Sequence, residues 1–159
     1  MYLRREKSGE TIPVSIEPVS NTDYKRITKA RFFFNWKIEK EFFVYKLTVK
    51  GEADILGLIS FKYIDEEYRI EIRLLAVAKE QTGKQKTVDR IAGNLFTFAA
   101  KKAISKYGDI AAVSLIPKTI LGQYYMDKYG FEQAGESLFL EGDSMLKLLN
   151  AYDDDEERI

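Results

Sequence analysis

The chain of 159 residues contains neither cysteine nor histidine. Without cysteine, disulfides, thiolate catalysis and cysteine-ligated zinc sites are excluded. Without histidine, the chain lacks the usual general base and the commonest metal ligand. Any proton transfer must therefore fall to Glu, Asp, Tyr, Lys, a chain terminus or water. A metal site would need carboxylates alone, and no tight cluster of Asp and Glu follows the expected strands, so we expect no metal.

The sequence also lacks a net charge and long apolar runs. Its 25 basic residues balance its 25 acidic residues, so no overall charge attracts the chain to nucleic acid or to a membrane surface. No apolar run approaches the roughly 20 residues that span a bilayer. Residues 1–7 lack the apolar segment of a secretory signal. We therefore expect a cytoplasmic protein that binds neither nucleic acid nor membrane.

Length and composition fit one globular domain. A chain of 159 residues can form a real core but is short for two domains, and no repeat or linker divides it. Its 45% hydrophobic and 31% charged residues are typical of such a domain. We expect a single α+β domain over residues 1–159, with flexible ends at residues 1–12 and 153–159.

Residues 70–103 predict the centre of the fold. Residues 70–77 form a strand of rising apolar content, residues 79–87 form a polar turn that contains Gly83 and several lysines, and apolar residues from Val88 to Ala103 recur at helical spacing. Such a turn at a helix N-terminus is a general device for holding phosphate, because amides of the first turn and the helix dipole favour an anion. The alternative is a plain strand–loop–helix connection with solvated charges.

The remaining segments predict further strands and helices around this centre. Before it we expect a first helix after residues 21–23, and strands at residues 14–17, 42–49, 55–63 and 68–77, the last three as an antiparallel meander. After it we expect a parallel strand at 110–116, a helix at 120–129, strands at 131–134 and 137–140, and a helix at 144–152. The aromatic run at 31–36 fits a buried helix or a strand, and we interpret it as core.

Three segments within residues 54–140 contain motifs at a recognisable order and spacing: Leu74–Val77, Thr82–Thr87 and Tyr125–Phe131. Together they resemble the GNAT superfamily of acetyl-CoA-dependent N-acetyltransferases. Leu74–Val77 is similar to the family's fourth strand. Thr82–Thr87 lies at the spacing of the family's Arg/Gln-Gly-x-Gly-x-Gly/Ala turn, although only Gly83 and Lys84 keep the family's residues. Tyr125–Phe131 is similar to the Phe-Tyr-Glu-Lys-x-Gly-Phe ending of the family's last helix.

The resemblance implies a fold and a co-substrate. The fold is α+β, with a mixed, mostly antiparallel central sheet flanked by helices, and with splayed fourth and fifth strands. The backbone of Leu75, Ala76 and Val77 is expected to support the thioester carbonyl and the pantetheine arm of acetyl-CoA. The other cofactor contacts are expected from the turn and from the residue after the fifth strand: Thr82, Gly83, Lys84, Gln85, Lys86, Thr87 and Thr119.

The implied reaction is direct attack of a primary amine on the acetyl thioester. It requires a neutral amine, a stabilised thioester oxygen and a proton for the leaving thiolate. Glu71 is the candidate base, acting through water, because it lies on the central strand among apolar residues. The alternative is an ion pair between Glu71 and Lys62, Arg69 or Arg73 across the sheet.

The candidate acid is Tyr125, with Tyr124 second. Met126 occupies the position of the family's catalytic tyrosine, and a slip of one residue turns a helical side chain by about 100°. The alternative for both tyrosines is aromatic packing against the sheet.

Three functions are therefore open. The first is an N-acetyltransferase that moves an acetyl group from acetyl-CoA to the amine of a small molecule or peptide. The second is a GNAT-like sensor or interaction domain that binds an acyl-CoA with little or no turnover, which Gln85 and Met126 favour. The third is a purely structural α+β domain. A homodimer is compatible with each of them, and no residue pattern names the acceptor.

Overall fold

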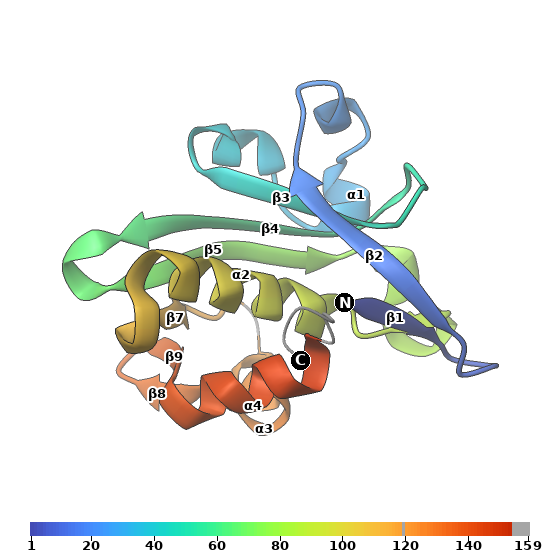
Figure 1. The fold of residues 1–159 in the computed structure, drawn as a ribbon. Coiled ribbons are helices and arrows are strands. Elements are labelled where there is room, and N and C mark those ends of the chain that lie inside the picture. Colours follow the sequence, from blue (N-terminus) through green and yellow to red (C-terminus); the bar gives the residue numbers. More distant parts are fainter. Residues whose placement is uncertain (119, 154–159) are drawn as a thin grey trace. The chain divides into compact units, whose positions relative to one another are not determined.

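The computed structural model describes residues 1–118 and 120–153 (Figure 1). Thr119 and residues 154–159 lie outside the described residues. Of the flexible end expected at residues 153–159, only Asp153 is described, and it is buried and lies 3.3 Å from Lys101 Nζ. The chain forms two compact units, which we describe separately: unit 1 contains Met1–Ser60 and Leu74–Leu95, and unit 2 contains Phe61–Arg73 and Phe96–Ile159. Within residues 1–118 and 120–153, no helix has both the length and the apolar character needed to cross a membrane.

The described elements confirm the expected α+β class. The strands are β1 (Tyr2–Arg5), β2 (Thr11–Pro18), β3 (Phe43–Val49), β4 (Ile55–Ile64), β5 (Arg69–Val77), β6 (Val88–Asp89), β7 (Ala112–Leu115), β8 (Glu132–Ala134) and β9 (Ser137–Glu141). The α-helices are α1 (Lys29–Phe32), α2 (Ile91–Tyr107), α3 (Gly122–Tyr129) and α4 (Gly142–Tyr152). Neighbouring strands follow the order β6-β1-β2-β3-β4-β5-β7-β9-β8, in which β4 and β5 run through both units.

In unit 1, the aromatic run at residues 31–36 forms core, as expected. It folds as the short helix α1 followed by the 3-10 turn η2 (Trp36–Glu41). The Phe32 and Trp36 side chains are buried against Leu58 of β4 and Ala76 of β5, and the Trp36 indole N–H donates to the Phe32 carbonyl at 3.0 Å. Phe33 differs, because its backbone has φ +71° and the residue is 44% exposed.

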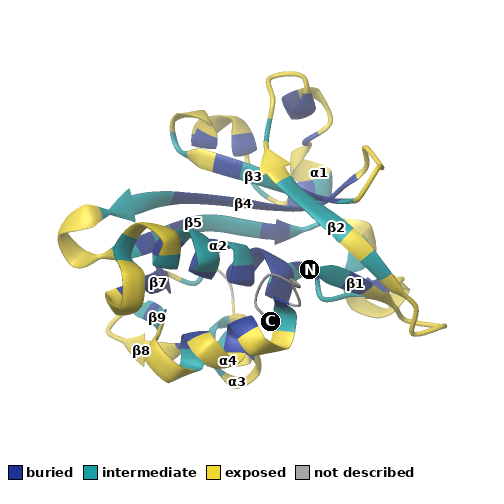
Figure 2. Cartoon of the chain, viewed as in Figure 1, coloured by how far each residue is buried: buried dark blue, intermediate teal, exposed yellow. Residues whose placement is uncertain are grey.

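The start of α2 packs on β4, which is buried for most of its length (Figure 2). The contact is close because β4 has glycine at residue 57. A Cβ on Gly57 would lie 2.7 Å from Ile91 Cγ2 and 3.0 Å from Leu95 Cδ1. Ile91 and Leu95 are one helical turn apart and lie on the same face of α2. This apolar face therefore contacts β4 at Gly57, which has no side chain.

The N-terminal residues differ from the prediction. The sequence predicts a flexible segment at residues 1–12, whereas the structure places the strand β1 there. β1 pairs with β2 and also with β6, through Arg4 opposite Asp89 and Arg5 opposite Val88. Leu3 is fully buried and anchors this strand in the core. The partner strand comes from far along the chain, so local pattern does not reveal the pairing.

In unit 2, β5 pairs with β7 in parallel, as the sequence predicts. The described ladder joins Arg69–Ile72 to Ala112–Leu115, while β5 continues to Val77. β7 is shorter than the predicted strand at 110–116, because Ile110 and Ile116 are exposed and lie outside it. β9 pairs antiparallel with β7, and β8 antiparallel with β9.

The predicted ending of the helix before residue 130 is confirmed. α3 stops at Tyr129, and Gly130 takes the left-handed conformation with φ +86°, while its N–H donates to the Met126 carbonyl at 3.1 Å. Glycine adopts this conformation without the cost that a side chain imposes. The termination therefore follows from one residue.

Candidate functional site

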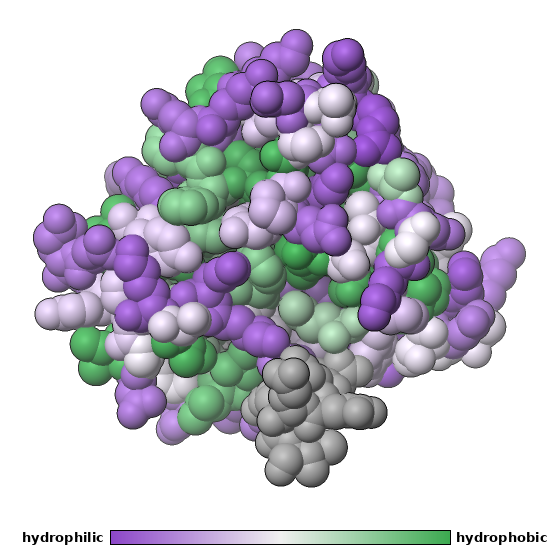
Figure 3. Space-filling view, turned by 45° about the horizontal axis from the view of Figure 1, so that its top comes forward, coloured by the Kyte–Doolittle hydropathy of each residue, from purple (hydrophilic) through white to green (hydrophobic). Residues whose placement is uncertain are grey.

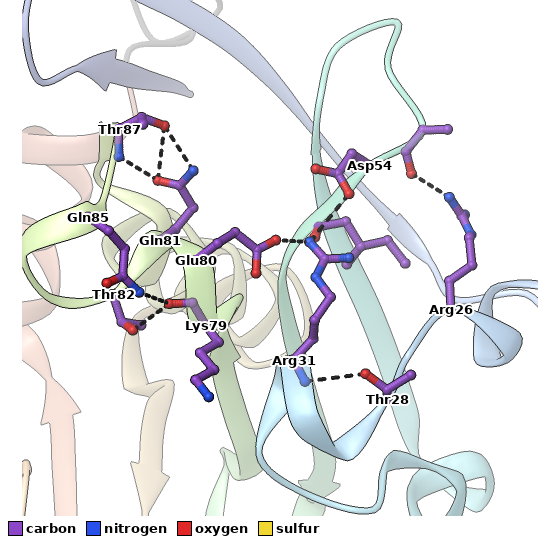
Figure 4. Close-up of polar contacts among 12 residues, drawn as sticks. Arg26, Thr28, Arg31, Asp54, Lys79, Glu80, Gln81, Thr82, Gln85 and Thr87 are labelled. Atoms are coloured by element: carbon purple, nitrogen blue, oxygen red, sulfur yellow. Dashed lines mark hydrogen bonds and ion pairs between the residues drawn. The ribbon is translucent and has the colours of Figure 1, made fainter.

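The loop between β5 and α2 is held by its own side chains (Figure 4). The Gln81 side-chain amide donates to Thr87 Oγ1 at 2.9 Å, and its oxygen accepts from the backbone N–H groups of Thr87 at 2.8 Å and Val88 at 3.2 Å. Gln81 thus closes the loop on itself. This closure fixes the shape of the turn that the sequence predicts as a phosphate site.

The other polar side chains of the turn face the loop backbone. Thr82 Oγ1 donates to the Lys79 carbonyl at 2.7 Å, and the Gln85 side-chain amide donates to the same carbonyl at 3.1 Å. Gly83 has φ +68°, a conformation that favours glycine. The Gln85 side chain is therefore directed back toward the backbone of its own loop.

The lysines of this loop differ in their partners. Lys86 forms ion pairs with Glu6 at 3.3 Å and with Asp89 at 3.4 Å. Lys79 and Lys84 are exposed, and within residues 1–118 and 120–153 their ammonium groups make no ion pair or hydrogen bond. Of the lysines predicted to contact the cofactor, Lys84 therefore has a charge that is available to an anion. The charge of Lys86 is already paired with two carboxylates of the chain.

The helix begins later than the sequence predicts. Val88 belongs to β6, and Ile91 is the first residue of α2, so the turn at Thr82–Thr87 does not lead directly into the helix. Arg90 links the two with φ +86°. Its Nε donates to the Tyr2 carbonyl at 3.1 Å, and its guanidinium lies 3.9 Å from the centre of the Tyr2 ring.

The residues at the true start of α2 match two of the four defined positions of the turn pattern that marks the resemblance. Arg90 stands at its first position and Gly93 at its fourth. The residue pattern alone does not single out this match, because the apolar periodicity starts at Val88. A search for every arginine followed three residues later by glycine would have found it.

Asn94 carries an orphaned polar atom in the first turn of α2. Its side-chain N–H donates to the Tyr2 carbonyl at 2.9 Å, while its Oδ1 is buried and has no hydrogen-bond partner among the residues that the structure describes. A buried acceptor of this kind usually has a donor, from protein, water or ligand. Oδ1 can accept a hydrogen bond from an N–H or O–H group of a ligand. It cannot donate one to a phosphate oxygen, because both atoms are acceptors.

The end of β5, where the sequence places Leu75, Ala76 and Val77, belongs to unit 1 together with the loop. The Ala76 side chain points into the apolar core beside Phe32 and Trp36, and Ala78 donates its backbone N–H to the Leu56 carbonyl at 2.9 Å. Leu75 and Val77 are half-buried. Ala76 and Ala78 thus attach this end of β5 to the core of unit 1.

Glu71 lies in unit 2 and makes the ion pairs that the sequence offers as an alternative. Its carboxylate lies 3.4 Å from Lys62 Nζ and 3.5 Å from the Arg69 guanidinium. Arg69 also donates to Ser114 Oγ at 2.6 Å. The predicted pairing is confirmed, while a role for Glu71 as a base stays a prediction.

Tyr125 lies in unit 2 within an aromatic cluster. Its ring centre is 5.2 Å from that of Phe96 and 6.2 Å from that of Tyr129. Burial, with a smaller contribution from Tyr124, raises the pKa of the Tyr125 hydroxyl, so it stays protonated at neutral pH as an acid must. The Tyr124 hydroxyl is exposed and accepts from Lys128 at 2.9 Å. The rings that contact Tyr125 thus belong to α2 and α3, and its role as the acid stays a prediction.

Large apolar side chains also reach the surface beside this cluster. They stand after β7 and at the start of α3: Ile116, Ile120, Leu121 and Tyr124. Ile120 is 98% exposed. On the face drawn in Figure 3, green hydrophobic areas are interrupted by purple hydrophilic ones. Within residues 1–118 and 120–153, no three Asp or Glu side chains are grouped to hold a metal ion.

Comparison with solved structures identifies the fold. No protein-family model and no curated protein sequence matches the chain. Its structure is similar to a chimera of the spermidine N-acetyltransferase SpeG from Vibrio cholerae with hSSAT, with a TM-score of 0.61 and 11% identity over 86% of this chain and 98% of the other. The chain has the GNAT fold.

Two further structures support this GNAT fold. The ribosomal-protein-S18-alanine N-acetyltransferase from Escherichia coli gives a TM-score of 0.56 with 11% identity, over 79% of this chain and 90% of the other. AtaTR bound with AcCoA gives a TM-score of 0.60 with 16% identity, over 86% of this chain and 98% of the other. At these identities the likeness concerns the fold. The GNAT architecture expected from three short segments is thereby confirmed.

Proposed function

We propose that the chain is an acetyl-CoA-dependent N-acetyltransferase that moves an acetyl group to a primary amine. The observation that carries the proposal is the GNAT fold, which the chain has in common with spermidine and ribosomal-protein N-acetyltransferases and with a structure bound with AcCoA. The loop after β5 adds support, because its fixed shape and exposed lysines suit a phosphorylated ligand.

The cofactor contacts would come from three parts of unit 1. The backbone of Leu75–Val77 would support the acyl and pantetheine arm. The turn at Thr82–Thr87, with Lys84, would attract the phosphates. The start of α2 at Arg90–Asn94 would face the diphosphate, because a helix N-terminus carries positive partial charge. Two observations support such a ligand: the exposed lysines of the loop, and the buried Asn94 Oδ1, which could accept from an amide N–H. Thr119 is proposed from the resemblance alone.

The catalytic roles of Tyr125 and Glu71 are proposed from the resemblance. A thioester supplies an acetyl group activated for attack by an amine. We assign Tyr125 to protonate the leaving thiolate, because its buried hydroxyl keeps its proton at neutral pH. Glu71 would accept the amine proton through water, in exchange for part of its pairing with Lys62 and Arg69. The acceptor is proposed to be a small-molecule or peptide amine.

A second function is a sensor or interaction domain that binds acyl-CoA without turning it over. Two observations favour it: Glu71 is held in ion pairs, and Met126 stands where the resemblance places a tyrosine. Either feature weakens proton transfer and leaves binding intact.

Calorimetric titration with acetyl-CoA, followed by an assay of thiol release with a panel of amines, separates these functions. An N-acetyltransferase binds acetyl-CoA and releases thiol only when an amine is present. Binding without release with any amine supports the sensor. Absence of binding excludes both functions and favours a purely structural domain.

A further inference from the structure

Arg31 joins three separate segments of unit 1 (Figure 4). It lies on α1, whose first turn is capped by Thr28, and its guanidinium donates to the Ile55 carbonyl at 2.9 Å and to Asp54 Oδ1 at 3.3 Å. The same guanidinium nitrogen also donates to the carboxylate of Glu80. Asp54 directly precedes β4, and Ile55 is its first residue. Glu80 belongs to the loop that follows β5.

Glu80 connects this arginine to the proposed cofactor loop. The next residue, Gln81, is the one that closes the loop through Thr87 and Val88. The Gln81 contacts fix the shape of the loop from within, but they do not fix its position on unit 1. Backbone hydrogen bonds tie both ends of the loop to unit 1, from the Ala78 N–H to the Leu56 carbonyl at 2.9 Å and from the Glu6 N–H to the Thr87 carbonyl at 2.9 Å. The Arg31–Glu80 pair adds a side-chain contact near the start of the loop, and the Lys86–Glu6 pair adds one near its end.

The charge of Glu80 makes Arg31 important for an anionic ligand. Hydrogen bonding to Arg31 lowers the pKa of the Glu80 carboxyl below its usual value, so Glu80 is ionised at neutral pH. An isolated carboxylate in a loop that binds phosphates would repel them. Paired with a guanidinium, it adds no net charge to the loop.

We propose that Arg31 is a positioning residue for acetyl-CoA, which acts through Glu80 to hold the loop at residues 79–87 in place and to neutralise its one carboxylate. This proposal rests on the proposed function, because it assumes that this loop binds the cofactor. Arg31 itself is not proposed to touch the cofactor or the acceptor. The competing explanation is an ordinary ion pair that contributes to stability alone.

The chain provides a matched control for the test. Glu80→Gln and Asp54→Asn each remove one carboxylate from the same guanidinium, and only Glu80 lies on the loop. We expect Glu80→Gln to raise the Kd for acetyl-CoA by up to about fivefold, the upper limit for an ion pair of this exposure. It should also speed hydrogen exchange at residues 79–87 in the cofactor-free protein. Asp54→Asn should change neither quantity, although both variants should lose similar stability.

A double-mutant cycle separates the two effects proposed for Arg31, which are holding the loop in place and neutralising the Glu80 carboxylate. Arg31→Gln should weaken binding more than Glu80→Gln, because it leaves the Glu80 carboxylate unneutralised. Adding Glu80→Gln to Arg31→Gln should therefore restore part of the affinity. If the double variant binds no better than Arg31→Gln, the neutralising role of Arg31 is excluded.

Other outcomes overturn the proposal directly. A Kd for Glu80→Gln equal to or lower than that of the wild type contradicts a positioning role, and so does an equal effect of Asp54→Asn. If the wild-type chain does not bind acetyl-CoA at all, the proposed function fails, and the role of Arg31 toward the cofactor fails with it.

Discussion

Adding one methyl group at Gly57 tests how closely the start of α2 is pressed onto β4. The new Cβ would lie 2.7 Å from Ile91 Cγ2 and 3.0 Å from Leu95 Cδ1. Ordinary carbon–carbon contacts lie at about 3.5–4.0 Å, so Ile91 must move by several tenths of an ångström. The Leu95 methyl ends a flexible side chain and can yield, whereas Cγ2 of Ile91 is fixed by its branch at Cβ.

The expected cost of Gly57→Ala follows from two opposing effects. Overpacking a well-filled core costs about 1–3 kcal/mol. Alanine restricts the unfolded chain, which stabilises the folded state by about 0.4–1 kcal/mol. We therefore predict that the variant loses about 1–2 kcal/mol of unfolding free energy. The affinity for acetyl-CoA should fall as well, because the displaced residues form the helix start that we assign to the diphosphate.

Urea unfolding followed by tryptophan fluorescence measures this loss. The single tryptophan, Trp36, is buried in the core of unit 1, to which Gly57 also belongs. Adding Ile91→Leu, which removes the Cγ2 methyl, should recover part of the stability of Gly57→Ala. A variant as stable as the wild type, or a second substitution without effect, would refute the close packing described here.

Three further predictions concern charge, catalysis and pH. Lys84→Glu should raise the Kd for acetyl-CoA by about three- to tenfold in calorimetry, because it reverses an available charge, while Lys50→Glu on an exposed turn should not. Tyr125→Phe should lower kcat at least about tenfold with the Kd unchanged, and an unchanged kcat removes it from the acid role. Burial alone would raise the pKa of Asp23, but hydrogen bonds from Lys46, the Ser20 amide and Arg26 lower it well below its usual 3.8. Its stabilising contribution is therefore complete above pH 3.8 and is lost as the pH falls below that value, so Asp23→Asn should flatten the decline in urea midpoint between about pH 5 and pH 2.

The elements that the sequence predicts well are those set by local pattern. In β3, β4 and β5, apolar residues either alternate with polar ones or follow one another without a break, and short polar turns separate the strands. Their ranges were therefore predicted to within one or two residues. The end of α3 depends on Gly130 alone. The parallel pairing of β5 with β7 follows from the helix between them, because such a connection returns the chain in the same direction.

The parts that escaped prediction depend on contacts between distant residues. β6 is a strand only because β1 pairs with it, and that pairing moves the start of α2 from Val88 to Ile91. The Arg31–Glu80 pair joins residues from two separate segments of unit 1. The candidate site was therefore anticipated in its loop residues, while the arginine that holds the loop and the true helix start were not.

Hydrogen exchange with and without acetyl-CoA tests the central claim most directly, because it reports on named backbone amides. We predict that saturating acetyl-CoA slows exchange at Leu75–Val77 and over residues 82–94. Unchanged exchange at these amides in the presence of bound acetyl-CoA would contradict the proposed cofactor site.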